Sequence, residues 1–155
     1  KTEVTTMRWK PHSTVATIIE KDGKLLFVEE LDAGQLVYNQ PAGHLEENES
    51  LIAAAVRETQ EESAYLCEIT GYLGLYTYTA ASNGVTYHRH CFVGKALSYD
   101  AQATLDEGIR GIRWLTPQEL IASNKARSPL VIRCAEDYFK RPHYPIELIY
   151  EHQND

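Results

Sequence analysis

Apolar residues along this chain occur in short runs separated by polar turn signals, a pattern typical of a protein rich in β-strands. Residues 13–20 and 24–30 are rich in Val, Ile, Leu and Thr, and they flank the pair Asp22-Gly23, a strong signal for a hairpin turn. We therefore predict that these two runs pair as antiparallel strands. The polar segment 31–43 is predicted to connect them to the first helix.

The middle of the chain changes from a helical composition to two long strand patterns. Residues 50–62 contain Ala, Leu, Arg and Glu, which favour a helix. Residues 69–80 and 85–97 are rich in Tyr, Thr and Val, and the Ser-Asn-Gly sequence at 82–84 predicts a hairpin between them. Residues 109–115 have the pattern of a further strand.

The last third of the chain carries two helix signals. Thr116 is a predicted N-cap, Pro117 takes the first helical position and Glu119 completes a capping box, so a short helix is expected to run to about Ala122. Residues 129–140 have apolar positions at helical spacing and are predicted to form the last helix. Together these elements predict an α+β fold, an α/β/α sandwich whose helices cover a mixed, largely antiparallel sheet.

The length of 155 residues predicts one domain with one buried core, which we place at residues 7–150. Residues 1–6 precede Met7, the only methionine, and are expected to be a tail or an expression remnant. No apolar run reaches the roughly eighteen residues that span a bilayer, and residues 1–10 have no segment typical of a signal peptide. We expect a cytoplasmic protein without a membrane partner.

Charge and cysteine content exclude further classes of site. The formal net charge is -7 at pH 7, whereas binding to a nucleic-acid polymer requires a basic face that releases counterions. A small anion held through a metal ion is compatible with this charge. Cys67, Cys91 and Cys134 are widely spaced and include no Cys-x-x-Cys pair, so we expect buried, reduced thiols rather than a disulfide framework or a zinc knuckle.

A group of acidic residues on the predicted helix 50–62 is the strongest candidate for chemistry. Glu61 and Glu62 follow Glu58 by three and four positions, so the three carboxylates share one helix face. Such a group is unfavourable alone, because like charges repel and the helix dipole disfavours anions near its C-terminal end. A hard divalent cation such as Mg²⁺ would offset the repulsion. A solvated acidic helix face is the alternative interpretation.

The spacing around these acids resembles the Nudix box, Gly-x5-Glu-x7-Arg-Glu-U-x-Glu-Glu-x-Gly-U, in which U is a bulky apolar residue. The matching positions are Gly43, Glu49, Arg57, Glu58, Glu61 and Glu62. Six such matches arise by chance about once in 10⁷ starting positions. The chain therefore resembles the Nudix hydrolases. This resemblance implies a Nudix-type sandwich in which the box residues form a loop and the helix that follows it.

Two positions depart from the box. Thr59 stands in place of an apolar residue, and Ala64 stands in place of the glycine that follows the helix. Glycine there adopts a left-handed conformation, which costs an alanine about 1 kcal/mol. Either the chain keeps this conformation with strain at Ala64, or the helix extends through Tyr65.

The resemblance continues outside the box and indicates the bacterial NudJ-like branch of the family over residues 7–149. The matching segments are 10–12, 38–46, 113–114, 127–131 and 144–147. This branch implies Mg²⁺-dependent hydrolysis of nucleoside di- and triphosphates and of thiamine-pathway pyrophosphates. Its members typically have Trp where this chain has Tyr38, so the surface offered for stacking on a base or ring differs.

The resemblance also implies roles for the box residues. The implied ligands of Mg²⁺, for which Mn²⁺ is a substitute, are Glu58, Glu62, Glu61 and the backbone carbonyl of Ala42. Glu49 supports Arg57 or the loop, and Gly43 belongs to the box loop. The carboxylate that takes a proton from the attacking water lies either on the box helix or at Glu107, beside Asp106. A solvated acidic loop is the alternative for Glu107.

Substrate contacts are implied for two arginines and two tyrosines. Arg89 and Arg127 match the branch and can hold phosphates through their planar donor groups, although each is equally compatible with a surface charge. Tyr38 and Tyr78 can stack on a base, as can Tyr76. Tyrosines in strands more often pack in the core or at its rim, which is the alternative for all three.

Two other functions stay open. Nudix hydrolases of ADP-ribose, dinucleoside polyphosphates or oxidised nucleoside triphosphates differ from the NudJ-like branch in loop shape and stacking contacts, which spacing does not reveal. A catalytically silent Nudix domain that senses a nucleotide is disfavoured by the intact acids. The expected partner is a small nucleotide or pyrophosphate, bound by a monomer or a homodimer.

Overall fold

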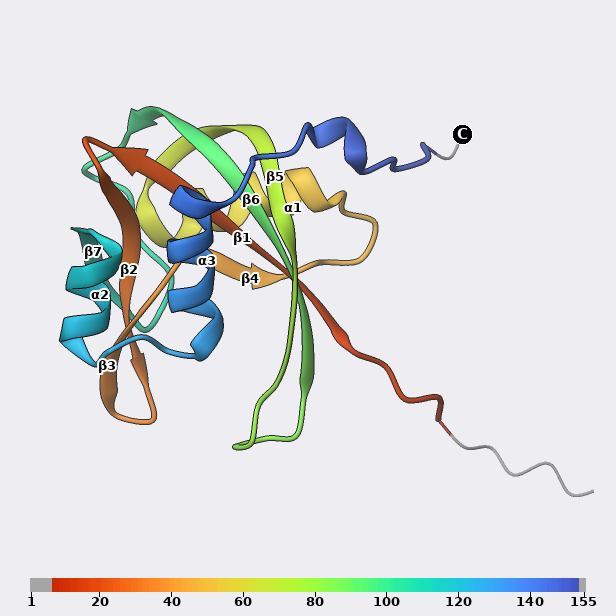
Figure 1. Ribbon diagram of the computed structural model, residues 1–155, viewed down its shortest axis with the longest axis horizontal. Helices are drawn as coiled ribbons and strands as arrows, with labels where there is room; N and C mark the ends of the chain where they lie inside the picture. Colours follow the sequence, from red (N-terminus) through yellow and green to blue (C-terminus); the bar gives the residue numbers. More distant parts are fainter. Residues whose placement is uncertain (1–6, 154–155) are drawn as a thin grey trace, which may run out of the picture.

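The computed structural model describes residues 7–153, whose helices and strands are arranged in layers around a twisted sheet (Figure 1). In chain order the elements are β1 (His12–Lys21), β2 (Lys24–Asp32), β3 (Gln35–Asn39), β4 (Ala42–His44), α1 (Leu51–Ser63), β5 (Tyr65–Thr79), β6 (Thr86–Tyr99), β7 (Ile109–Leu115), α2 (Pro117–Ser123), α3 (Pro129–Lys140) and the 3-10 turn η1 (Ile146–Leu148). The predicted tail, residues 1–6, lies outside the described residues.

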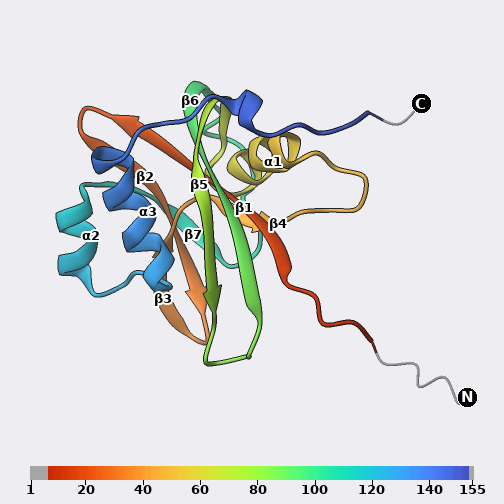
Figure 2. The same cartoon turned by 45° about the vertical axis from the view of Figure 1, so that its right-hand side comes forward.

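The predicted hairpin of β1 and β2 forms, but its strands separate soon after the turn. Asp22 and Gly23 have φ of 51° and 81°, as a tight hairpin turn requires. Beyond the two residue pairs next to this turn, β1 pairs in parallel with β6 and antiparallel with β4, whereas β2 pairs antiparallel with β3 and β7 (Figure 2). The predicted mixed, largely antiparallel sheet is therefore confirmed.

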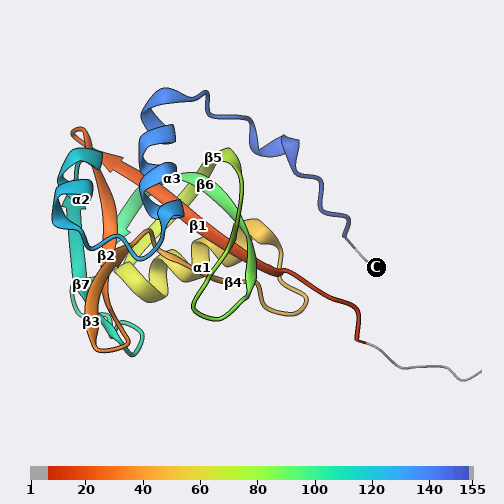
Figure 3. The ribbon, with the colours of Figure 1, turned by 60° about the horizontal axis from the view of Figure 1, so that its bottom comes forward.

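Alternating side chains of the sheet build two cores, one under α1 and the other under α2 and α3 (Figure 3). On one face of β1, Val15 packs in a cluster with Ala54 and Ala55 of α1. On the opposite face, Ala16 and Ile18 belong to the second cluster. The buried residues that α2 and α3 contribute to it are Leu120, Val131, Cys134 and Ala135. This arrangement confirms the predicted α/β/α sandwich.

Helix α1 lies close to the sheet because its buried face is made of small side chains. Its start is fixed by Ser50, whose Oγ accepts a hydrogen bond from the Ala53 N–H at 3.0 Å. Thr59 is fully buried, whereas Ile52 and Val56 are only half-buried. The helix thus rests mainly on Ala54, Ala55 and Thr59, and the face that carries Glu58 is buried as well.

Part of the polar segment 31–43 forms strands, which the apolar pattern does not predict. β3 pairs with β2 across a turn at Ala33 and Gly34, whose φ are 51° and 81°. β4 has three residues and pairs with β1. Neither strand has an apolar alternation of its own, because each is held by backbone hydrogen bonds to a partner strand. The sequence likewise carries no signal for η1.

The capping box that the sequence predicts for α2 forms in the structure. The Glu119 N–H donates to Thr116 Oγ1 at 3.1 Å and the Thr116 N–H donates to Glu119 Oε1 at 2.9 Å, which completes the capping box of α2. The three cysteines are buried and unpaired. No helix within residues 7–153 is long and apolar enough to cross a membrane.

Ala64 ends α1 in the left-handed conformation that the box glycine would adopt. Its φ is 65° and its ψ is 10°, and its N–H donates to the Gln60 carbonyl at 3.0 Å. The alternative, a helix that extends through Tyr65, is wrong. The strain of a left-handed alanine, about 1 kcal/mol, therefore remains in the folded protein.

We predict that Ala64→Gly increases the free energy of unfolding by up to about 1 kcal/mol, because glycine adopts this backbone conformation without steric cost. Urea denaturation measures the change. The matched control is Ala53→Gly, at an exposed position inside α1, which should lower the free energy of unfolding by roughly 0.5–1 kcal/mol. Destabilisation by both substitutions would contradict the strained conformation at Ala64.

Candidate active site

An open cleft of about 590 Å³ lies where β4, the second half of α1, the β5–β6 hairpin and the start of α3 meet. The predicted site residues that line it are Ala42, Gly43, Glu58, Glu62, Tyr78, Arg89 and Arg127. The fold thus brings together residues from five separate stretches of sequence. Their chemistry is not uniform, since carboxylates lie at one part of the cleft and arginines and tyrosines at others.

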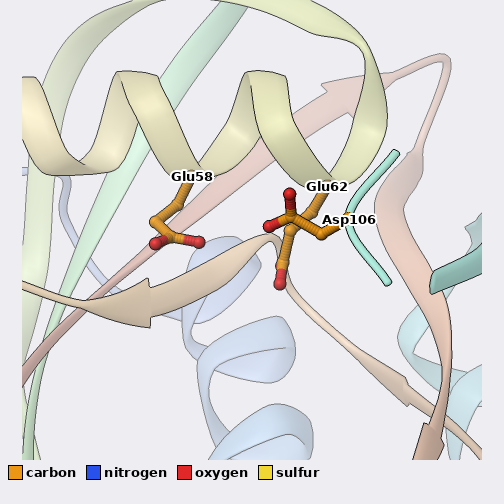
Figure 4. Close-up of side chains that lie close together, drawn as sticks. All are labelled: Glu58, Glu62 and Asp106. Carbon is orange, nitrogen blue, oxygen red and sulfur yellow. The ribbon is translucent and has the colours of Figure 1, made fainter. Parts of the chain in front are cut away.

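Three carboxylates converge beside the cleft (Figure 4). Glu58 and Glu62 lie one turn apart on α1, and Asp106 comes from the loop between β6 and β7. Each offers an oxygen atom, and these atoms all lie within 4.8 Å of one another. The Asp106 N–H donates to the Glu61 carbonyl at 3.1 Å, which ties the loop to the helix. An all-oxygen donor group of this size suits a hard divalent cation.

Gly43 lets the Glu58 carboxylate lie directly against strand β4. A side-chain Cβ at this position would overlap with the carboxyl carbon and both carboxylate oxygens of Glu58. The glycine is therefore required for space rather than for an unusual backbone angle. The box residues Gly43 and Glu58, fifteen positions apart, form one tight contact.

Arg57 fixes the acidic side chains around it. Its Nε and Nη2 donate to the two oxygens of Glu49 at 2.6 Å and 3.0 Å, a bidentate pair. Its Nη1 donates to Glu58 at 2.6 Å and to Glu61 at 3.1 Å, and its Nη2 also donates to the His44 carbonyl at 3.2 Å. The Arg57 hydrogen bond lowers the pKa of Glu49. Arg57 therefore contacts Glu58 directly and ties the box loop to α1.

Burial shifts the protonation of the two clustered glutamates. Burial raises the pKa of Glu58, and the hydrogen bond from Arg57 partly opposes this shift. Burial raises the pKa of Glu62 to about 8. The hydrogen bond that Glu62 accepts from the Ala42 N–H at 3.0 Å lowers this pKa in part, and the negative charges of Glu30, Glu58 and Asp106 raise it further. A cation bound here would displace the proton and compensate the charge.

Glu61 and Glu107 lie outside this three-residue group. The Glu61 side chain is 41% exposed and its carboxylate pairs with Arg57. Glu107 is exposed, and its neighbour Asp106 is the loop acid that reaches the cluster. Asp106 could not be distinguished from Glu107 in the sequence, because both acids fit the same loop and spacing does not show which of them points toward α1.

Arg89 is buried at the wall of the cleft among neutral partners. Its Nη1 donates to Gln40 Oε1 at 2.8 Å and its Nη2 donates to Asn39 Oδ1 at 3.0 Å. Gln40 is in turn anchored by the hydrogen bond from its Nε2 to the Val131 carbonyl at 2.9 Å. Amide oxygens accept hydrogen bonds from a guanidinium without compensating its charge, so the site favours an anion in the cleft. Asn39 and Gln40 were missed from the sequence, although both lie in the segment 38–46.

The other predicted substrate contacts have different surroundings. Arg127 is half-exposed at the cleft and pairs with Glu30 at 2.7 Å. Tyr38 is buried in the core and does not line the cleft. Tyr76 is also buried, and its hydroxyl donates to Asp137 at 2.9 Å. Tyr78 alone of the three tyrosines named from the sequence lines the cleft.

Comparison with known proteins agrees with this geometry. Residues 10–133 match the family model of the NUDIX domain. The chain is 33% identical to phosphatase NudJ of Escherichia coli strain K12 over 141 residues, which cover 91% of this chain and 92% of that protein. A NUDIX hydrolase from Nitrosomonas europaea is 42% identical, with a TM-score of 0.89 and coverage of 92% of this chain and 98% of that one. A MutT NUDIX hydrolase from Burkholderia pseudomallei, 18% identical over 83% of this chain and 98% of that one, shares the fold with a TM-score of 0.71.

Replacement of Gly43 by alanine should displace the Glu58 carboxylate while the fold is kept, because the overlapping atoms are the end of a flexible side chain. We expect divalent-cation affinity, measured by calorimetry with Mn²⁺, to fall by about 10- to 100-fold. The matched control is Gly111→Ala on β7, where a Cβ meets nothing within 4 Å. Equal cation affinity in both variants would contradict the contact between Gly43 and Glu58.

The raised pKa of Glu62 predicts how stability depends on pH in the presence of a chelator. The unfolded side chain loses its proton near pH 4.5 and the folded one near pH 8, so the stabilisation is complete below pH 4.5 and is lost as the pH rises to about 8. We expect the free energy of unfolding to fall over this range, with a slope of at most about 1.4 kcal/mol per pH unit for one proton.

The control for this profile is Glu62→Gln, measured by urea denaturation at the same pH values. Subtraction of its profile removes the contributions of His44 and His90, whose pKa values are lowered by burial and therefore act with the opposite sign. Parallel profiles of the wild type and Glu62→Gln would show that Glu62 titrates normally.

Proposed function

Since this chain belongs to the NUDIX family and is a hydrolase that acts on pyrophosphate bonds, we propose that it is a Mg²⁺-dependent hydrolase of phosphoanhydride bonds in nucleoside di- and triphosphates or thiamine-pathway pyrophosphates. Residues 7–150 would act as one catalytic unit. The observation that carries the proposal is the convergence of Glu58, Glu62 and Asp106 at a cleft whose wall also holds Arg89.

The donor group fits Mg²⁺ better than a softer metal ion. Its three side chains offer only carboxylate oxygens, and no thiol or imidazole belongs to the group of atoms within 4.8 Å in residues 7–153. We propose Glu58 and Glu62 as the first ligands, with Asp106 as the loop ligand. Glu61 and the carbonyl of Ala42 remain candidates for the same ion. Mn²⁺, which also prefers oxygen donors, is expected to substitute.

The residues around the cleft suggest a division of roles in hydrolysis. When bound, Mg²⁺ would neutralise phosphate charge and lower the pKa of a water molecule beside it. Arg89 would hold a phosphate from the buried wall, and Arg127 would do so from the rim after release from Glu30. Arg57 would keep Glu58 oriented.

Proton transfer from the attacking water requires a carboxylate near the phosphorus atom. Asp106 and Glu107 lie on the loop that reaches the cluster, and Glu61 lies on the box helix beside it. Asp106 already belongs to the group around Glu58 and Glu62, where it is proposed as a ligand. We therefore propose Glu107 and Glu61 as the candidate bases.

The similarity to phosphatase NudJ supports phosphate release from small substrates. The test is a hydrolysis panel that contains nucleoside di- and triphosphates, hydroxymethylpyrimidine pyrophosphate, ADP-ribose and a dinucleoside polyphosphate, with phosphate and pyrophosphate measured separately. Activity should disappear with EDTA and return with Mg²⁺ or Mn²⁺, and Zn²⁺ should restore it poorly. Hydrolysis that persists in EDTA would refute the role of the metal.

Two glutamine variants, assayed with the same panel, test whether the carboxylate cluster is the catalytic centre. Glu58→Gln and Glu62→Gln should each lower kcat at least about 10²-fold at saturating Mg²⁺, because each removes a ligand charge at nearly constant volume. The matched surface control is Glu68→Gln, at an exposed position on β5, which should leave kcat unchanged. Wild-type turnover in both site variants would exclude this carboxylate cluster as the catalytic centre.

A further inference from the structure

The β5–β6 hairpin extends beyond the layers of the molecule (Figure 1; Figure 2). Its residues form one wall of the cleft. Two tyrosines from this hairpin line the cleft, Tyr78 on β5 and Tyr87 on β6. They are direct partners in the strand register, so their side chains lie next to each other on one face of the hairpin. Tyr87 was not predicted from the sequence as a site residue.

Tyr87 also belongs to an aromatic group at the mouth of the cleft. Its ring centroid lies 5.8 Å from that of His12 and 6.2 Å from that of His44, both in edge-to-face orientation. The two histidines are joined by a hydrogen bond of 3.1 Å between ring nitrogens. The Asn83 amide at the hairpin tip donates to the Tyr87 hydroxyl at 3.0 Å, which fixes the ring from the other side.

The position of this aromatic group relative to Arg89 suggests what it binds. Tyr87 and Arg89 are two residues apart on β6, so they face the same side at a Cα separation of roughly 7 Å. Within residues 7–153 the cationic side chains that line the cleft are Arg89 and Arg127, and Glu58 and Glu62 of the carboxylate cluster line the same cleft. Beyond Arg89 the hairpin wall is aromatic and uncharged, and its polar groups are amide and hydroxyl groups.

We propose that Tyr78 and Tyr87, with His44 at the cleft mouth, form the subsite for the aromatic heterocycle of the substrate, while Arg89 and the carboxylate cluster take its pyrophosphate. This inference rests on the proposed function and adds where the organic part of the substrate is bound. Stacking on tyrosine requires a planar ring and tolerates different heterocycles. The subsite therefore favours pyrophosphates of nucleosides or other heterocycles over pyrophosphates of aliphatic alcohols.

The test compares two substrates that share the anhydride bond but differ in the ring, cytidine triphosphate and inorganic tripolyphosphate. Tyr87→Leu should raise KM for cytidine triphosphate by about fivefold or more, the lower limit of base stacking on an aromatic side chain, with little change in kcat. KM for tripolyphosphate should not change. If tripolyphosphate is not turned over, its inhibition constant against cytidine triphosphate replaces KM.

Three further variants separate stacking from structural effects. Tyr87→Phe keeps the ring and loses only the hydroxyl, so its KM should stay within about twofold of the wild-type value. Tyr78→Leu should repeat the KM increase, and it serves as the test if thermal unfolding shows that Tyr87→Leu does not fold. Tyr150→Leu, at a tyrosine that is 81% exposed and does not line the cleft, should change neither KM.

The outcomes distinguish this inference from the proposed function. An equal rise in KM for both substrates, or unchanged KM for cytidine triphosphate in Tyr87→Leu and Tyr78→Leu, would overturn the ring subsite while phosphohydrolysis stands. If the wild type hydrolyses neither of these two substrates, the full hydrolysis panel decides the proposed function, and calorimetric binding of cytidine monophosphate decides the subsite. Weaker binding in Tyr87→Leu than in Tyr150→Leu would support it, and equal binding would overturn it.

Discussion

The mutual repulsion of three carboxylates in a partly buried corner is the constraint on which the rest of this structure depends. Glu58, Glu62 and Asp106 bring oxygen atoms within 4.8 Å of one another, in surroundings that raise the pKa of Glu62 to about 8. Arg57 compensates the charge of Glu58, whereas Glu62 receives only one backbone N–H, from Ala42. The corner is therefore most favourable when a divalent cation occupies it.

Much of the neighbouring chain holds this corner in place. Strand β4 lies directly against the Glu58 carboxylate, and this contact is possible because Gly43 has no side chain. The bidentate pair of Arg57 with Glu49 closes the box loop onto α1, and the left-handed Ala64 turns the chain from α1 into β5. The strain at Ala64 is tolerated because the Ala64 N–H also donates a hydrogen bond to the Gln60 carbonyl in the last turn of the helix.

The sequence predicted those features that depend on neighbours in the chain and missed those that depend on distant ones. Helix α1, the capping box of α2 and the shared face of Glu58 and Glu62 follow from local spacing. β3 and β4 do not, because their stabilising hydrogen bonds come from strands elsewhere in the sheet. Asp106 and Gln40 escaped prediction for the same reason, since their roles arise only when a loop or strand is packed against α1 or Arg89.

Tyr38 and Tyr87 show that the fold uses tyrosines in two different ways, one in the core and one at the cleft. Tyr38 lies in a strand that pairs along its length with β2, so its side chain is used by the core. Tyr87 lies on the β5–β6 hairpin, which extends away from the layers (Figure 1), and its ring packs against His12 and His44. Substitutions on the hairpin can therefore change the aromatic wall without replacing any of the acids on α1. The acids Glu58 and Glu62 belong to the box helix, whereas the aromatic residues Tyr78 and Tyr87 belong to the separate β5–β6 hairpin. The same acidic centre can therefore be combined with hairpins that prefer different heterocycles.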